Sequence, residues 1–482
     1  MTARTGITKQ GCGLVIGLIL FLLTLVLPPP PDMPLTAWHV AGIAMLMASW
    51  WISEALPLPA TAMLPLVVFP VLGTAPLRQA AAPYADPIIF LFLGGFILSV
   101  AMQRWSLHKR MGLKTIAWIG TTPRRLVGGF LFATAFISLW VSNSATAMMM
   151  LPVAISVVTL FSGLRAADDT SFRNLGIALL LAVAYGASIG GLGSLIGTPP
   201  NALLAAYMAR EHGVEITFAQ WMLLGVPLAI VMLAVTWAVL CRRYPVALQG
   251  GADATEAIAA EIRNLGPVSR AEIRVAFIFA LTALAWITSP LLSSFIPGLS
   301  DTLIAIAAAL ALFLLPSGMP CKSGLLAWED LRDLPWGILL LFGGGLSLAD
   351  AMGSSGLAAW LGDAMSLLRG MPVLLIVAAA TAFMIFFTEL TSNTASAATF
   401  IPIGAAVAVG MGLDPLILTV PLALAASCGF MLPVGTPPNA IVFSTGLVPS
   451  GQMAATGFWL NLLAGLLIIL ICQLLAIPVF GG

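Results

Sequence analysis

Long apolar runs dominate the chain, and short polar segments interrupt them. Residues 13–27, 222–240 and 462–475 approach the ~20 residues that a membrane-spanning helix needs. The runs are continuous rather than alternating, which excludes a transmembrane β-barrel. The first run follows a short charged tail and ends at the prolines 28–31 without a small-residue cleavage site. We therefore expect a retained first helix rather than a signal peptide.

Two polar motifs each occur twice inside apolar sequence. Residues 141–147 (VSNSATA) correspond to 391–397 (TSNTASA), and 197–202 (GTPPNA) return unchanged at 435–440. Backbone at membrane depth leaves the helix only where it lines a cavity or is buried in protein. A matched pair of broken segments, one in each half, is typical of secondary transporters with an internal repeat. The motifs therefore predict a membrane carrier.

The repeat extends beyond these motifs. Residues 88–102 align with 338–352 at an offset of 250, and eight of the fifteen positions are identical. Asn143 and Asn393 have the same offset. By contrast, the stretch 242–272 is polar and carries eight of the chain's 20 basic and 19 acidic residues, which indicates a solvated, partly helical linker.

We therefore divide the chain into two repeats joined by a linker. The expected units are a tail and first helix at 1–35, a first repeat at 36–241, a cytoplasmic linker at 242–273 and a second repeat at 274–482. Scaffold helices are expected at 36–120 and 274–370, and a hairpin with a broken helix at 121–241 and 371–482.

Orientation follows from the distribution of positive charge. Five crossings per repeat, with a re-entrant hairpin at each Ser-Asn motif, give about 11 transmembrane helices, and an odd number of crossings inverts the second repeat. With a cytoplasmic N-terminus, seventeen Lys and Arg residues face inward and only Arg78, Arg210 and Arg369 face outward, in agreement with the positive-inside rule. We thus expect an all-α, multi-pass protein of the inner membrane, with its N-terminus in the cytoplasm and its C-terminus outside.

Composition narrows the function classes. The chain is 60% hydrophobic and 8% charged, which excludes a soluble globular domain of this size. Its formal charge of +1 argues against nucleic acid as a partner. The sequence gives no support for an enzyme, because it has only three histidines and no HExxH or GxSxG motif at a plausible site. It also lacks the GxxxxGK[ST] motif that an ATP-driven pump would need. The five cysteines, in no metal-binding pattern, are expected to be idle thiols: Cys12, Cys241, Cys321, Cys428 and Cys472.

The breaks themselves predict the binding chemistry. Helices are expected to begin at membrane depth just after Asn143, Pro199, Asn393 and Pro437. A helix start presents unpaired N–H groups and the positive end of its dipole, so several pointed at one centre form an anion site. No basic residue lies within twelve positions of Asn143 or Asn393. The free carbonyls of the preceding helix ends, with Ser, Thr and Asn oxygens, suit Na⁺.

Other interpretations of the same residues remain open. A single Ser-Asn-Ser segment in an apolar helix is more often a helix–helix hydrogen bond, although two copies in register disfavour that role. Asn201 and Asn439 are either structural caps or ligands. Glu389 is either a coupling or gating acid or a satisfied structural one, and the corresponding residue in the first repeat is Leu139. A channel would differ from a carrier by transport that does not saturate.

These motifs, together with residues 51–59 (WISEALPLP) and the paired glycine-rich helices at 88–102 and 338–352, resemble the divalent anion–sodium symporter family over nearly the whole chain. That family includes sodium-coupled dicarboxylate, citrate and sulfate carriers. The resemblance implies a homodimer in which a transport domain slides against a fixed scaffold, as an elevator. It also implies Na⁺-coupled symport of a C4-dicarboxylate such as succinate, malate or fumarate. The alternatives are a sodium-independent di- or tricarboxylate exchanger and a citrate or sulfate carrier of the same fold.

The resemblance further implies the site residues. One sodium site would draw on Ser138, Ser142, Asn143 and the Gly197 carbonyl, and the other on Thr388, Thr391, Asn393 and the Gly435 carbonyl. The substrate carboxylates would meet Asn143, Ser144, Thr198, Asn393, Thr394, Thr436 and Pro437. The family's first motif usually has Thr where this chain has Ser144, so the shape of the anion pocket is expected to differ at that point.

Overall fold

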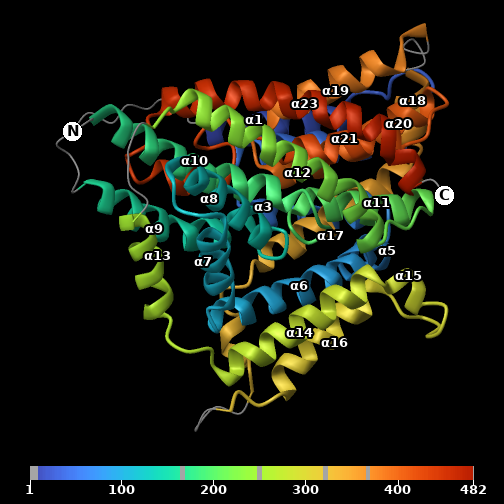
Figure 1. Cartoon of the computed structure of the whole chain (residues 1–482). Helices are drawn as coiled ribbons and strands as arrows, with labels where there is room; N and C mark the ends of the chain where they lie inside the picture. The colour runs from blue at the N-terminus through green and yellow to red at the C-terminus, as the bar shows by residue number, and fades with distance from the viewer. Residues whose placement is uncertain (1–8, 163–168, 247–251, 319–323, 365–369, 481–482) are drawn as a thin grey trace, which may run out of the picture.

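The computed structural model describes residues 9–162, 169–246, 252–318, 324–364 and 370–480 (Figure 1). Within these ranges the regular elements are all helices, and eight of them are long and apolar enough to cross a membrane. The prediction of an all-α, multi-pass membrane protein is therefore confirmed. Further apolar helices are shorter than a full span, and about 11 spans remains a prediction. Arg369 and Cys321 lie outside the described residues.

The first half of the chain contains the following helices. The segment before the first hairpin forms α1 (Lys9–Val26), α2 (Leu35–Ser53), α3 (Leu58–Thr61), α4 (Leu64–Leu72), α5 (Leu77–Ala81), the 3₁₀ helix η1 (Ala82–Ala85), α6 (Pro87–Arg104) and α7 (Leu107–Ile119). The hairpin and broken helix form α8 (Pro123–Ser138), α9 (Asn143–Ser162), α10 (Asp169–Gly191), α11 (Pro199–His212) and α12 (Phe218–Arg243).

The second half repeats much of this order after a linker helix. The linker contains α13 (Ala252–Asn264), and the helices before the second hairpin are α14 (Arg270–Ile287), α15 (Ser289–Leu292), α16 (Asp301–Leu314), the 3₁₀ helix η2 (Trp328–Leu331), α17 (Trp336–Ser354) and α18 (Leu357–Ala364). The hairpin and broken helix are α19 (Val373–Thr388), α20 (Asn393–Gly410), α21 (Leu416–Ala426), α22 (Pro437–Phe443) and α23 (Ser450–Phe480).

The two halves use corresponding contacts. In the first half α10 packs against α8, α9 and α12, and in the second half α21 packs against α19, α20 and α23. Between the halves, α11 contacts α20 and α21, while α22 contacts α9 and α10. The helix starts of each half therefore rest against the hairpin of the other half, and this exchange brings both copies of the polar motifs together.

Glycines permit close backbone contacts in the helices that precede the hairpins. A Cβ added to Gly94 of α6 would lie 2.7 Å from the backbone of Ala305 in α16, and one added to Gly344 of α17 would lie 2.3 Å from the Ala62 carbonyl oxygen. Any side chain at these positions would overlap backbone atoms that cannot move aside. The glycine-rich segments of α6 and α17 therefore allow close packing.

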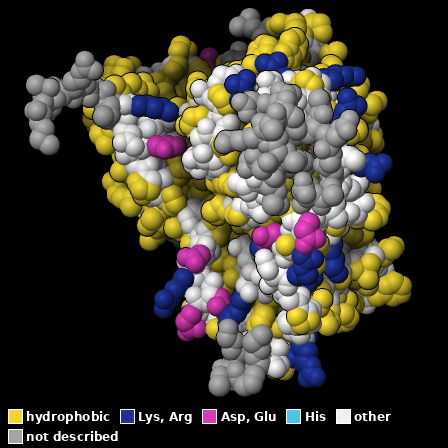
Figure 2. All heavy atoms as spheres, turned by 60° about the vertical axis from the view of Figure 1, so that its left-hand side comes forward, with side chains coloured by type: hydrophobic (Ala, Val, Ile, Leu, Met, Phe, Trp, Pro, Cys, Tyr) yellow, Lys and Arg dark blue, Asp and Glu magenta, His cyan; other side chains and the backbone are white. Residues whose placement is uncertain are grey.

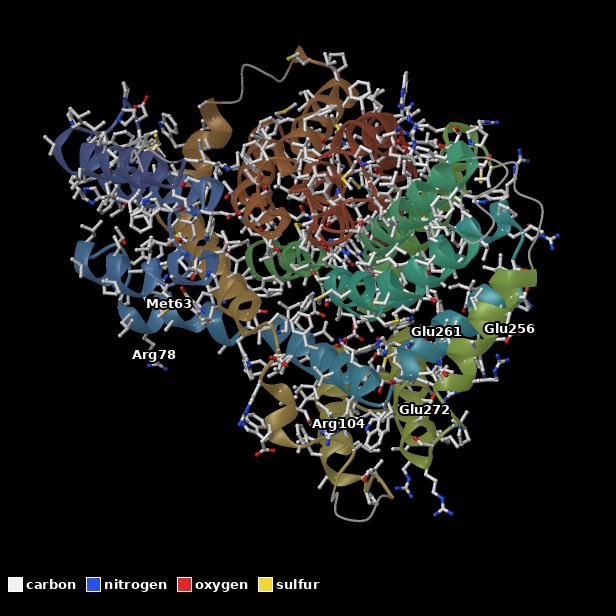
Figure 3. All side chains as sticks on the ribbon, turned by 90° about the vertical axis from the view of Figure 1, so that its left-hand side faces the viewer. Met63, Arg78, Arg104, Glu256, Glu261 and Glu272 are labelled. Carbon is white, nitrogen blue, oxygen red and sulfur yellow. The ribbon has the colours of Figure 1, made fainter. Side chains whose placement is uncertain are left out.

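The polar linker joins the helices at one end of the molecule. In Figure 1, α13 and α7 lie at the left-hand end of the long helices, and Figure 3 looks onto this end, with Glu256 and Glu261 on α13 and Glu272 at the start of α14. The Arg110 guanidinium pairs with the buried Glu272 carboxylate, and Lys109 Nζ lies 2.9 Å from Glu261 Oε2. Lys and Arg side chains are spread over this end in Figure 2. One ion pair, Lys109–Glu261, thus fastens the linker helix α13 to α7, and the Arg110–Glu272 pair fastens the start of α14 to α7.

Candidate anion and cation site

Four helices begin at the repeated motifs. In the two hairpins α9 begins at Asn143 and α20 begins at Asn393, and each start lies five positions after the last residue of the preceding helix. In the two broken helices α11 begins at Pro199 and α22 at Pro437, where proline is favoured because a first-turn residue needs no N–H partner. The predicted helix starts are therefore confirmed, although α22 is only seven residues long.

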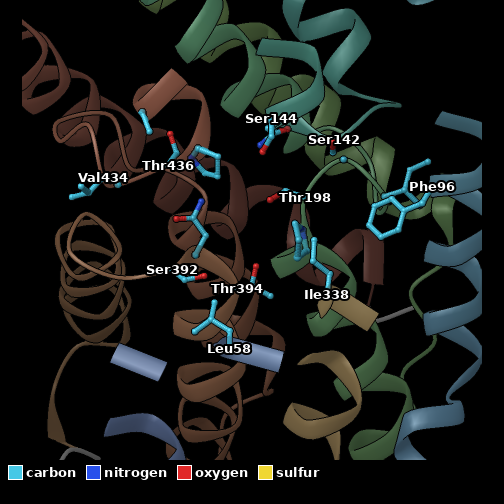
Figure 4. A pocket seen from close by; sticks show the side chains of 18 of the residues that line it. Leu58, Phe96, Ser142, Ser144, Thr198, Ile338, Ser392, Thr394, Val434 and Thr436 are labelled. Atoms are coloured by element: carbon cyan, nitrogen blue, oxygen red, sulfur yellow. The ribbon is translucent and has the colours of Figure 1, made fainter. Parts of the chain in front are cut away.

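The four starts surround one cavity of about 370 Å³ (Figure 4). The labelled hydroxyl side chains Ser144 and Thr198 come from the first half of the chain, and Ser392, Thr394 and Thr436 come from the second. The complete lining is Glu54, Leu58, Phe96, Ser142, Asn143, Ser144, Ile196, Gly197, Thr198, Pro199, Ile338, Ser392, Asn393, Thr394, Val434, Gly435, Thr436, Pro437 and Ala440. This lining, drawn from the described part of the chain, includes no Lys, Arg or His.

A cluster of oxygen atoms lies at the first hairpin tip. The side-chain oxygen of Asn143 accepts a hydrogen bond from Ser138 Oγ at 2.6 Å. The same position lies 3.0 Å from the carbonyl oxygen of Ala187 and 3.2 Å from that of Gly197. Both carbonyls belong to the region where α10 ends and α11 begins, so the hairpin and the broken helix contribute to one cluster. A Cβ added to Gly191 would lie 2.5 Å from the Asn143 oxygen, so a side chain there would crowd the cluster.

The second hairpin tip has the corresponding cluster. Thr388 Oγ1 lies 2.9 Å from the side-chain oxygen of Asn393. The same position of Asn393 lies 3.2 Å from the carbonyl oxygen of Ala426 and 3.1 Å from that of Gly435. Each cluster thus combines one hydroxyl, one amide and two carbonyls, from equivalent places in the two halves.

The orientation of the two amides decides what each cluster can hold. With the nitrogen turned inward, each amide would donate to the surrounding oxygens. With the oxygen inward, each cluster gathers four oxygens around a single hydroxyl proton, an arrangement that a hard cation satisfies. Neutral side-chain oxygens and free carbonyls at a helix break are the ligands expected for Na⁺ at membrane depth. The residues therefore fit Na⁺ without any carboxylate in direct contact.

Ser142 and Thr391, the remaining residues predicted to bind sodium, differ in their surroundings. Ser142 lines the cavity beside the first cluster. The Thr391 hydroxyl instead lies 3.2 Å from the Phe387 carbonyl and 2.7 Å from Ser396 Oγ, so it is engaged within its own hairpin. The structure thus brings the hydroxyl, amide and carbonyl groups of each half together but does not direct the Thr391 hydroxyl into the second cluster.

The predicted substrate residues all line the cavity. Among them, Thr198 Oγ1 lies 3.1 Å from Ser427 Oγ, which connects the start of α11 to the end of α21. Thr436 has a different partner, because its hydroxyl accepts from the Asn439 N–H at 3.4 Å and caps α22. The two cavity threonines are therefore equivalent in sequence but not in bonding.

Asn201 and Asn439 act as structural caps. Asn201 Nδ2 donates to the Ser194 and Gly191 carbonyls at 2.8 and 3.2 Å, and Asn439 Nδ2 donates to the Leu432 and Gly429 carbonyls at 3.0 and 3.1 Å. Both side chains are fully buried, and neither lines the cavity. Of the two roles left open for these residues, the structure supports the cap, which holds the loop before each Gly-Thr-Pro-Pro helix start.

Ala187, Ala426 and Glu54 are among the site residues that were not predicted. The Ala187 and Ala426 carbonyls belong to the segments Ala-Ser-Ile-Gly and Ala-Ser-Cys-Gly, and this recurrence, a few residues before each Gly-Thr-Pro-Pro motif, is the signal that could have indicated them. Glu54 belongs to the segment 51–59 and was not predicted at the site. It lines the cavity, is exposed, and has a left-handed backbone with φ of 52°.

Comparison with known proteins places this arrangement among ion-coupled carriers. A family described as the sodium:sulfate symporter transmembrane region matches residues 8–481. A protein of Staphylococcus saprophyticus subsp. saprophyticus named sodium-dependent dicarboxylate transporter SdcS is 43% identical over 98% of this chain and 92% of its own length. A protein of the same name from Staphylococcus aureus (strain MRSA252) is 42% identical over 98% of this chain and 92% of its own length.

A solved structure shares the fold. The structure of Neisseria gonorrhoeae MtrF, described as illuminating a class of antimetabolite efflux pumps, has a TM-score of 0.57, and the alignment covers 99% of this chain and 98% of MtrF. Its sequence is 12% identical, so the likeness concerns the arrangement of helices alone.

Proposed function

The chain belongs to the sodium:sulfate symporter family, and on that premise we propose that it is a secondary active transporter that carries a C4-dicarboxylate into the cell together with Na⁺. Succinate, malate and fumarate are the substrates we propose. The observation that carries the proposal is the single cavity that both hairpin tips share, with an oxygen cluster beside each tip.

The cavity holds an anion through backbone dipoles. The helices α9, α11 and α20 begin at its wall, so their first N–H groups and positive dipole ends are available to a carboxylate. The hydroxyls of Ser144, Thr394 and Thr436 supply further donors. The lining takes Asn143 and Ser144 from the first half and Asn393 and Thr394 from the second, so each carboxylate of a dicarboxylate can meet one of the two motifs. The named relatives add independent support for a dicarboxylate substrate.

Sodium and substrate are coupled because they use the same helix breaks. Asn143 belongs to the first oxygen cluster and is also the first residue of α9. In the second half, Asn393 likewise belongs to the second cluster and is the first residue of α20. A cation bound at the cluster fixes the start of the helix, and the fixed start offers its N–H groups to the carboxylate. Each ligand therefore raises the affinity for the other, as linkage requires.

We further propose the membrane arrangement that the family resemblance implies. The two repeats are inverted, the N-terminus is cytoplasmic, the C-terminus is outside, and two chains form a dimer in which the hairpin-bearing domains move as elevators. The exchanged contacts of α11 with α20 and of α22 with α9 support a two-fold relation between the repeats.

Uptake of labelled succinate into proteoliposomes tests the proposal. We expect saturable uptake with an inward sodium gradient and little uptake when choline replaces sodium. Uptake that needs internal dicarboxylate but no sodium would identify an exchanger instead. Competition by unlabelled succinate, malate, fumarate, citrate and sulfate would rank the substrates, and stronger competition by sulfate or citrate than by any C4-dicarboxylate would contradict the proposed substrate class.

A further inference from the structure

The two oxygen clusters share their ligand types but differ in charge nearby. Glu389 directly follows Thr388 of the second cluster, whereas the corresponding neighbour of Ser138 in the first cluster is Leu139. The Glu389 side chain is buried, with only 3% of the residue exposed. Among the described residues no Lys or Arg lies within ion-pair distance of it. A buried carboxylate without a basic partner requires another source of stabilisation.

Hydrogen-bond donors supply part of that stabilisation. Glu389 Oε1 accepts from the Met431 N–H and from Asn461 Nδ2, both at 2.7 Å, and Oε2 accepts from the Leu432 N–H at 2.8 Å. Asn461 in turn accepts from the Phe430 N–H at 3.2 Å. Glu389 and Asn461 together therefore hold three consecutive N–H groups of the loop between α21 and α22.

This loop carries one of the two carbonyl ligands of the second cluster. It begins after Ala426 and ends before Thr436, so it includes the Gly435 carbonyl that faces Asn393. A Cβ added to Gly435 would lie 2.6 Å from Glu389 Oε2, which places the carboxylate directly beside the ligand-bearing residue. The carboxylate is thus both a fastening for the loop and the formal negative charge closest in sequence to the second cluster.

The first half fastens its loop with neutral groups. Ser194 Oγ donates to the Leu139 carbonyl and accepts from the Gly197 N–H at 3.0 Å, and Trp221 Nε1 donates to the Leu192 carbonyl at 2.9 Å. The Leu139 side chain fills the space beside Gly193, where an added Cβ would lie 2.4 Å from Leu139 Cδ1. The loop geometry of a cluster can therefore be maintained without a carboxylate, and holding the loop does not by itself explain Glu389.

We propose that Glu389 is a positioning residue that makes the second cluster the charge-assisted sodium site, while the first cluster binds sodium through neutral oxygens alone. The two sites are then unequal in affinity, with the second filled at lower sodium concentration. A cation at the second cluster completes the neutralisation that the three hydrogen-bond donors to the Glu389 carboxylate begin. This inference rests on the proposed sodium coupling and adds the assignment of unequal roles to the two sites.

Sodium-dependent thermal stabilisation of the purified protein separates the two sites, with choline chloride keeping the ionic strength constant. In Asn143→Ala the stabilisation by sodium should come mainly from binding at the second cluster, and in Asn393→Ala it should come mainly from binding at the first. In the Asn143→Ala background we expect Glu389→Gln to raise the sodium concentration for half-maximal stabilisation by about tenfold or more, since a nearby charge is removed. In the Asn393→Ala background we expect the same substitution to change that concentration by less than about twofold.

Two further variants distinguish charge from loop fastening. Asn461→Ala removes one donor but keeps the carboxylate, so it should lower the unfolding temperature while leaving the half-maximal sodium concentration in the Asn143→Ala background within about threefold. Leu139→Met is the matched control in the first half and should leave both quantities nearly unchanged. If Glu389→Gln does not fold, the Asn461→Ala result still decides: a sodium affinity weakened about tenfold would overturn the charge assignment.

The outcomes separate this inference from the proposed function. If the unsubstituted protein shows no stabilisation by sodium over choline, sodium coupling itself fails. If sodium stabilises the unsubstituted protein but Glu389→Gln acts equally in both backgrounds, sodium coupling stands and the unequal roles of the two sites are overturned.

Discussion

The hydroxyl of Thr198 lies 3.1 Å from the hydroxyl of Ser427, although 229 positions separate the two residues. The bond crosses from the start of α11 in the first half to the end of α21 in the second, and both residues are buried. It therefore links the two halves of the site directly at the cavity wall.

Loss of this bond should weaken the site. Thr198→Val keeps the shape of the side chain but leaves Ser427 without its partner, and we expect the succinate concentration for half-maximal uptake to rise about tenfold, corresponding to ~1.4 kcal/mol. Thr198→Ser keeps the hydroxyl and should stay within about threefold of the unsubstituted protein. Equal behaviour of the two variants in proteoliposome uptake would show that the hydroxyl makes no contribution.

The two hairpin asparagines should be indispensable for sodium coupling. Asn143→Ala and Asn393→Ala each remove the amide at the centre of one oxygen cluster while leaving the apolar helix packing intact. We expect sodium-driven succinate uptake to fall to background in both variants, with normal elution in size-exclusion chromatography. Near-normal uptake by both at limiting sodium would refute the cluster assignment.

Arginines near the hairpins should not contribute to anion affinity. Arg104 is paired with Asp330 and lies over the Trp105 ring, and neither Arg124 nor Arg125 lines the cavity. Replacing each of the three with Gln should leave the half-maximal succinate concentration within about twofold, because backbone N–H groups hold the anion. A selective loss of affinity in one variant would indicate that a basic side chain reaches the substrate.

Ser144 should influence which acid is preferred. Its partner in the second repeat, Thr394, has an additional methyl group that shapes the cavity, and both side chains line it. Ser144→Thr should change the relative affinities for succinate, malate, fumarate, citrate and sulfate, measured in competition assays. The change should be at most ~1–3 kcal/mol, the contribution of one methyl group in a pocket. The sodium response should remain unchanged. A shifted sodium response with an unchanged ranking would place Ser144 at the cation site instead.

The helix starts of the site were predictable because their causes are local. Proline after Gly-Thr and the polar Ser-Asn motif specify a break wherever they occur in apolar sequence, and α9, α11, α20 and α22 begin at those residues. The Ala187 and Ala426 carbonyls were not predictable in this way, because every residue has a carbonyl and only the folded structure brings these two to Asn143 and Asn393. The partners of Glu389 also escaped prediction, since Asn461 lies 72 positions further along the chain.

The way the cavity attracts anions has a consequence for how its substrate specificity can evolve. Its attraction for negative charge comes from backbone N–H groups at helix starts, and no single codon encodes such a group. A mutation at Ser144 or Thr394 can therefore alter which anion fits without altering the preference for anions. Related chains could in this way diversify in substrate, from one organic acid to another, while the charge preference is inherited unchanged with the fold.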